Sequence, residues 1–443
     1  MLGFLLTKDL LISFQCYYFL LNTCAFVSAV FIIKNIKEPS LKNIHLWIIF
    51  LIFTIGYFFK FYILAYLKLY HSDFSSDFLN TNFPLESYLL GKPILVINYF
   101  EIVTALLLIF SVISFFILKN SKLDLKMYSE YALKPISIRN QKKINILFIC
   151  AAILSISYFC FQLKTGIGIA SRDPSSVMSL PYHLAGIISA LGKWFLPVLF
   201  MLLILLSFAA NLRVKQYISI SLYIVFGMIA SLISTSRFDF LFIVITLAVL
   251  LFSIGKLSKK YIFILAILIC IATLSSNLIA FIRTGDLVYN GPLKYVTLLL
   301  RVNGADSLLN ILNHSTSFSF DRIIHRLFES SLTINDQFSI DVLGFEPKEG
   351  LGFSTSLIGR FYFIFESLIV VSFVFGFYIF TWHYVFVYAN KIFSDITPIF
   401  ISLLSVTLAF ITSEGNFESL PFMFLFATAA SFFSKIFFTK LKD

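Results

Sequence analysis

The chain has 443 residues, of which 59% are hydrophobic and 13% are charged. Soluble domains carry roughly 25% charged residues, so the composition excludes an ordinary soluble protein and predicts an all-α polytopic membrane protein. The formal net charge of +11 is explained by lysines and arginines in loops on one membrane face, and it implies no nucleic-acid partner.

Apolar segments long enough to cross a bilayer recur along the chain, and they are too long for barrel strands. We expect about 11 membrane-spanning helices. The predicted spans are 10–33, 44–66, 94–118, 144–163, 184–209, 217–235, 238–255, 261–282, 361–389, 397–412 and 419–437. A half-helix is expected within 351–366, before the ninth span. All five cysteines lie inside these spans, so no disulfide framework or cysteine-based metal site is supported.

Lysines and arginines crowd the loops 34–43, 119–143 and 256–260 and the C-terminal tail. The positive-inside rule makes this face cytoplasmic, with the N-terminus outside and the C-terminus inside. Residues 283–356 then form one large extracytoplasmic loop, and long loops without repeats are usually functional. We therefore divide the chain into transmembrane helices at 1–282, a catalytic loop at 283–356 and transmembrane helices at 357–443.

Ionisable groups within the spans gather near their outer ends, as Lys60, Glu101, Lys193 and Glu366 show. A transporter with alternating access should instead carry polar groups near the midplane. The pattern favours a shallow cavity that opens to the outside. The alternative is that these long side chains simply reach the membrane–water interface.

Several arginines lie where an outer cavity would open. Arg237 occupies the tight turn between the sixth and seventh spans, Arg283 follows the eighth span, and Arg360 ends the loop. Arg301 and Asp306 interrupt an apolar segment, 293–312, which we expect to form a helix that lies on or dips into the outer membrane surface. A guanidinium binds phosphate through paired hydrogen bonds. The alternative for each arginine is anchoring to lipid headgroups.

The segment 321–329 is predicted to be a helix with two charged stripes. Asp321, His325 and Glu329 recur at every fourth position, and Arg322 and Arg326 form the neighbouring stripe. A histidine beside a carboxylate can act as a general base near neutral pH, and two arginines could hold a pyrophosphate. A solvated helix face with ion pairs is the alternative.

Other chemistries have little support in the sequence. A Walker loop, a dinucleotide-binding glycine motif, a zinc-protease motif and a serine-hydrolase elbow are all missing. Asp73 and Asp77 could contact a divalent cation, but two spaced aspartates are a weak signal. We therefore expect no cofactor and no metal.

On these features the chain resembles the Wzy-type O-antigen (oligosaccharide repeat-unit) polymerases. The features that carry the resemblance are the many spans, the Ser236–Arg237 turn, Arg283 and Arg301 ahead of Asp306, one dominant late outer loop, and the stretch 356–362. The O-antigen ligases share this GT-C-like plan and are the nearest relatives with which the chain could be confused. A lipid-linked oligosaccharide flippase is a further alternative.

The resemblance implies a glycosyltransferase in the bacterial inner membrane, with its main loop in the periplasm. It would polymerise glycans linked to undecaprenyl pyrophosphate, and a chain-length regulator protein would be a partner. The implied pyrophosphate ligands are Arg237, Arg283 and Arg301, with Arg360, Arg322 and Arg326 nearby. The implied general base is His325, oriented by Asp321, with Asp306 or Glu366 as the alternative.

Overall fold

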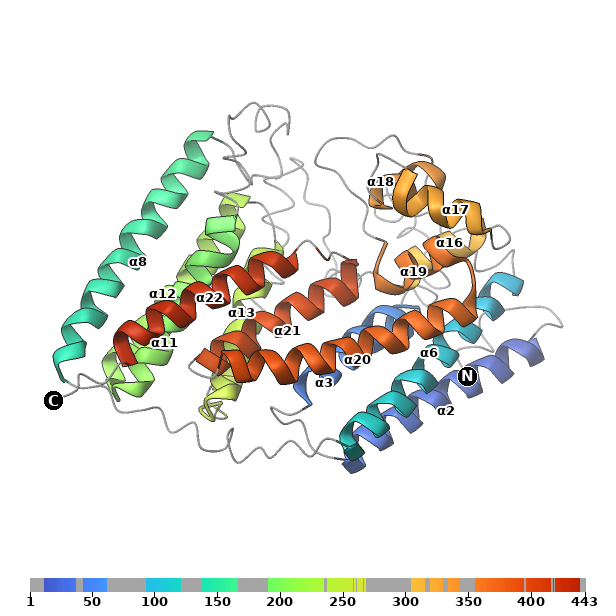
Figure 1. Ribbon diagram of the computed structural model, residues 1–443, viewed down its shortest axis with the longest axis horizontal. Helices are drawn as coiled ribbons and strands as arrows, with labels where there is room; N and C mark the ends of the chain where they lie inside the picture. Colours follow the sequence, from blue (N-terminus) through green and yellow to red (C-terminus); the bar gives the residue numbers. More distant parts are fainter. Residues whose placement is uncertain are drawn as a thin grey trace. The chain divides into compact units, whose positions relative to one another are not determined.

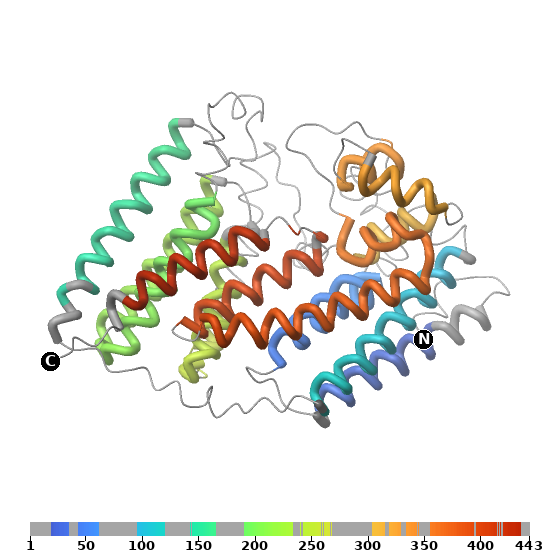
Figure 2. Tube along the Cα trace, viewed as in Figure 1, coloured from blue at the N-terminus to red at the C-terminus, as the bar shows by residue number. Residues whose placement is uncertain are grey.

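The protein is described by a computed structural model, and every regular element in its described residues is a helix (Figures 1 and 2). The described residues are 12–36, 43–61, 93–120, 138–165, 190–234, 237–257, 259, 261–265, 267, 304–314, 319–329, 334–342, 344, 355–393, 396–415, 417 and 419–438. The prediction of a helical protein is confirmed for this part of the chain.

Five helices among the described residues are long and apolar enough to cross a membrane. They are α6 (Pro93–Asn120), α8 (Ile138–Thr165), the π-helical turn η4 (Leu191–Phe195) with α11 (Leu196–Ala209), α12 (Arg213–Ser234) and α20 (Leu368–Ile392). Their length and composition fit an integral membrane protein. The larger number of about 11 spans stays a prediction.

The remaining predicted spans are also helical where they are described. They are α2 (Ile12–Ile36), α3 (Ile44–Phe53) with the π-helical turn η1 (Thr54–Phe59), α13 (Arg237–Ser253), α21 (Thr397–Glu414) and α22 (Ser419–Phe438). Most of the eighth predicted span, 261–282, lies outside the described residues.

The chain divides into two compact units. Unit 1 contains Met1–Leu123, Val296–Phe386 and Leu408–Phe417, and unit 2 contains Asp124–Tyr295, Val387–Thr407 and Glu418–Asp443. In unit 1, α2 packs along α6, and the late loop joins these early helices. In unit 2, α11 packs against α8, α12 and α22.

The described part of the late loop (283–356), together with the half-helix that follows it, is a set of short helices in unit 1. They are α16 (Ala305–His314), α17 (Phe320–Ile324) with the π-helical turn η6 (His325–Glu329), α18 (Ile334–Asp341) and α19 (Leu357–Phe365). Ile311, Phe338, Val342 and Phe363 form a small apolar core among them. Burial of this core holds the segment together as a folded element.

The described part of the helix that we expect on, or dipping into, the outer membrane surface is packed against other helices of the protein. Residues 305–312 of α16 are all buried, where it contacts α6, α19 and η1. The helix starts at Ala305, directly after Gly304, and 293–303 lie outside the described residues. The apolar side chains of the described part therefore face neighbouring helices, and its depth in the membrane stays a prediction.

The half-helix predicted before the ninth span is confirmed as α19. Glu366 follows it in the left-handed conformation, with φ of 46°, and such a residue ends a helix. The long helix α20 therefore begins at Leu368, a few residues later than the predicted start of the ninth span.

Candidate functional site

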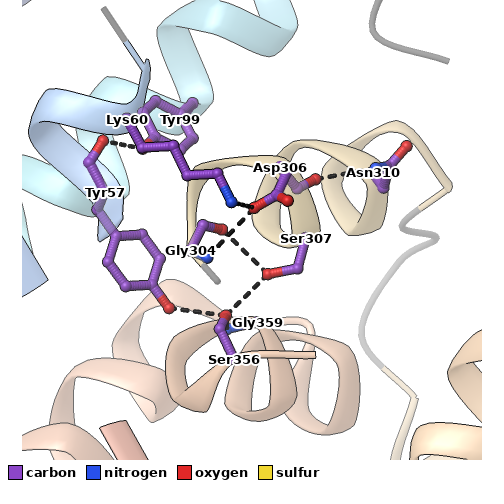
Figure 3. A network of polar contacts seen from close by, with 9 residues as sticks. All are labelled: Tyr57, Lys60, Tyr99, Gly304, Asp306, Ser307, Asn310, Ser356 and Gly359. Carbon is purple, nitrogen blue, oxygen red and sulfur yellow. Dashed lines mark hydrogen bonds and ion pairs between the residues drawn. The ribbon is translucent and has the colours of Figure 1, made fainter. Parts of the chain in front are cut away.

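A buried polar network joins the second predicted span to the late loop within unit 1 (Figure 3). We call it the polar seam and define it as Tyr57, Lys60, Asp306, Ser307 and Ser356. Tyr57 lies in η1 and Lys60 follows it, Asp306 and Ser307 open α16, and Ser356 caps α19. All five residues are buried. The seam therefore brings together segments that are far apart in the sequence.

Lys60 and Asp306 form the charged half of the polar seam. Lys60 Nζ lies 2.8 Å from Asp306 Oδ1, and the side chains are 2% and 9% exposed. The same carboxylate oxygen accepts a hydrogen bond of 3.3 Å from the Gly304 amide. Each of these buried charges offsets the desolvation cost of the other, because either one alone would be left buried without compensation.

The other half of the seam is a chain of hydroxyl groups with a defined direction. Tyr57 donates to Ser356 over 2.8 Å, and the oxygens of Ser356 and Ser307 are 2.8 Å apart. Ser307 donates its hydrogen to the Gly304 carbonyl over 3.0 Å, so Ser356 must be the donor to Ser307. The donors therefore run from Tyr57 to Ser356, then to Ser307 and the backbone of Gly304.

Backbone groups complete this network. The Ile358 amide donates to Tyr57 Oη and the Gly359 amide donates to Ser356 Oγ, both over 3.2 Å. Tyr99 on α6 donates to the Tyr57 carbonyl over 2.5 Å. The first turn of α19 is thus capped by side chains from the seam, which satisfies amides that the helix itself leaves without acceptors.

Two features of the backbone let the seam close. A Cβ atom on Gly304 would lie 2.4 Å from the Gly56 carbonyl oxygen, so only glycine permits this approach of the loop to η1. Ser356 has φ of 57° and ψ of 164°, a region that side chains rarely adopt. Its three hydroxyl contacts offset that backbone strain.

A second charged group, the guanidinium cluster, consists of Arg322, Arg326 and Glu366. Arg322 Nη1 lies 3.3 Å from Glu366 Oε1 and 3.1 Å from Oε2, and Arg326 Nη1 lies 3.0 Å from Oε1. Arg326 also donates to the Phe363 carbonyl and stacks on its ring, 4.0 Å from the centroid. The two guanidinium groups therefore share one carboxylate.

The structure brings some of the predicted site residues together and separates others. Arg322, Arg326 and Glu366 form one cluster. Asp306 belongs to the polar seam. Both carboxylates proposed as alternative bases are thus engaged by cations, which leaves them poorly placed to accept a proton from a substrate.

Asp321 and His325 are both exposed, on the outer side of α17 and η6. Arg360 is half-buried and donates to the Gly415 carbonyl. The backbone of Arg237 begins α13, but its side chain lies outside the described part of the chain, as do Arg283 and Arg301. Their proposed contacts with phosphate stay predictions.

Sequence reasoning noted Lys60 and Asp306 but did not pair them, and it missed Tyr57, Tyr99 and Ser307. Two opposite charges in apolar surroundings are a signal for pairing, because a lone charge there is costly. Tyrosines and serines carry no such signal, since they also occur in ordinary spans. Comparison of the chain with family models, curated proteins and solved structures finds no match. Its function must therefore follow from its own residues.

Proposed function

We propose that the protein is a glycosyltransferase that polymerises lipid-linked oligosaccharide repeat units, in the manner of the Wzy-type O-antigen polymerases. The observation that carries the proposal is the folded late loop. Its short helices pack on membrane-type helices, and it holds two guanidinium groups that share the carboxylate of Glu366. A connection that only linked two spans would not need this construction.

The chemistry asks for positive charge beside a reacting sugar. The bond between the donor sugar and its lipid pyrophosphate breaks while a bond forms to a hydroxyl of the acceptor. A base takes the hydroxyl proton, and cations stabilise the charge that grows on the pyrophosphate. The donor is already activated, so the reaction needs no ATP.

The residue roles in this proposal follow from where the described side chains lie. Arg322, which is 34% exposed, can contact an anion while Glu366 orients it. His325 is exposed and is our proposed base. Asp306 is assigned a positioning role, because its ion pair with Lys60 holds α16 against the second predicted span. Arg237, Arg283, Arg301 and Arg360 are the further proposed phosphate ligands.

The decisive experiment is gel analysis of surface polysaccharide in a deletion strain that is complemented with variants. The deletion should leave surface molecules that are capped with a single repeat unit, and Arg237→Ala should do the same. Arg213→Ala is the matched control, because this exposed arginine begins α12, whereas Arg237 follows the end of that helix. Long chains should persist in the control.

Chains of normal length in Arg237→Ala would remove that residue from the site. A deletion strain with no capped product at all would overturn the polymerase and point to the ligase or the flippase.

A further inference from the structure

The helix Phe320–Glu329, formed by α17 and η6, turns its apolar face away from the protein. We call it the inverted helix. Phe320 and Phe328 are 67% and 80% exposed, and Leu327 is 40% exposed. Ile324 lies midway between the two phenylalanines on the same stripe, at intervals of four residues. In a water-soluble protein such a stripe would face the core.

The opposite face of the inverted helix binds the protein through charge. Arg322 and Arg326 follow Phe320 and Ile324 by two residues, which places them about 200° around a helix. Both reach Glu366 at distances between 3.0 and 3.3 Å. The helix is therefore fixed with its cations inward and its aromatic rings outward.

Glu366 also links this helix to the start of α20. It stands two residues before α20, a candidate membrane span. The first turns of α20 expose a stripe of their own, with Ile369, Phe373 and Phe377 at 71%, 77% and 74% exposure. Exposed apolar stripes on a membrane span face lipid. The inverted helix is thus tethered where the lipid-facing surface of α20 begins, beside α19 (Figure 1).

We propose that the inverted helix lies in the membrane interface, with Phe320 and Phe328 among the lipid acyl chains. An amphipathic helix at a bilayer surface buries its apolar face below the headgroups and keeps polar groups at the water boundary. Asp321 and His325, both exposed, would occupy that boundary. The ion pairs to Glu366, two residues before a candidate membrane span, favour lipid over a protein partner. This inference does not depend on the proposed enzymatic function.

The test uses the full chain in phospholipid nanodiscs, with the native cysteines replaced by serine or alanine. A nitroxide label is attached at Phe328→Cys and, as the matched control on the same helix, at Asp321→Cys. Power saturation then compares collisions with oxygen, which concentrates in lipid, with collisions with a water-soluble nickel chelate. We expect the oxygen-to-nickel ratio at position 328 to be about threefold or more above that at position 321.

Equal ratios at the two positions would overturn the proposal, because position 328 would then face water. Low collision rates with both reagents at position 328 would also overturn it, since a second protein surface would then cover the helix. Both labelled positions are exposed, so labelling removes no packed side chain. Folding is checked by the elution profile of each variant.

Discussion

At the scale of single residues, the buried ion pair of Lys60 and Asp306 gives the most direct prediction about stability. Neither charge is solvated by water, because both side chains are less than a tenth exposed. The Gly304 amide donates a hydrogen bond to the same Asp306 carboxylate. Removal of one charge should therefore disturb the join between η1 and α16, and not just one contact.

We predict that Lys60→Met lowers the free energy of unfolding by about 3–5 kcal/mol, because it strands the Asp306 carboxylate. The double variant Lys60→Met, Asp306→Leu should recover much of that loss. Thermal unfolding in detergent measures both. Lys193→Met is the control, since this lysine is exposed on η4. Equal effects of the single and double variants would contradict a mutual role of the two charges.

The strained serine of the seam gives a second residue-scale prediction. Ser356→Ala loses the hydroxyl contacts and keeps the left-handed backbone, whereas Ser356→Gly loses the contacts but releases the strain. The glycine variant should therefore be more stable than the alanine variant by about 1 kcal/mol. The same unfolding assay decides this, and a more stable alanine variant would refute the role of backbone strain.

At the scale of elements, the helices could be predicted well from apolar runs alone. α12 and α13 match the predicted spans on either side of the Ser236–Arg237 turn, because a tight turn between two apolar runs leaves few alternatives. The half-helix expected within 351–366 is also present, as α19.

The candidate site could be predicted less well, because local departures from α-helical geometry decide its contacts. The π-helical turn η1 shifts the register just before Lys60, and η6 does so between Ile324 and Glu329. A π-helical turn follows an altered hydrogen-bond pattern, which apolar periodicity does not reveal. The ion pair of Lys60 with Asp306 therefore could not be predicted from the spacing of residues in the sequence. The same holds for the ion pairs of Arg322 and Arg326 with Glu366.

The close approach of Gly304 to η1 makes an element-scale prediction. Gly304→Ala should push α16 away from η1, because the added carbon would lie 2.4 Å from a backbone oxygen that cannot move aside. The expected loss of stability is about 1–3 kcal/mol, as for other overpacked sites. Gly376→Ala is the control, since its added carbon would meet the ends of the Ile113 and Ile109 side chains, at 2.8 and 3.6 Å, and no backbone atom within 4 Å. Equal melting temperatures for both variants would contradict the close contact.

At the scale of the whole molecule, membrane orientation connects the structure to the proposed function. The prediction rests on the clustering of lysines and arginines in alternate loops. It puts the guanidinium cluster on the outer face, where a lipid-linked glycan would be polymerised. The exposed residues Asp341 and Lys256 are suitable reporters for the two faces.

In a cysteine-free background, Asp341→Cys should react with a membrane-impermeant maleimide in intact spheroplasts. Lys256→Cys should react only after the membrane is opened. Mass shift on a gel measures both reactions. The reverse pattern would put the late loop in the cytoplasm and would remove the basis for the proposed polymerase.

The direction of the hydroxyl chain in the polar seam has one more consequence. Tyr57, Ser356 and Ser307 each own a single hydroxyl hydrogen, and each already gives it to the next oxygen in line. None is left to offer a sugar or to relay a proton to solvent. The Ser356 hydroxyl, which also accepts from the Gly359 amide, is thus a poor nucleophile, because its hydrogen and both of its acceptor positions are already used.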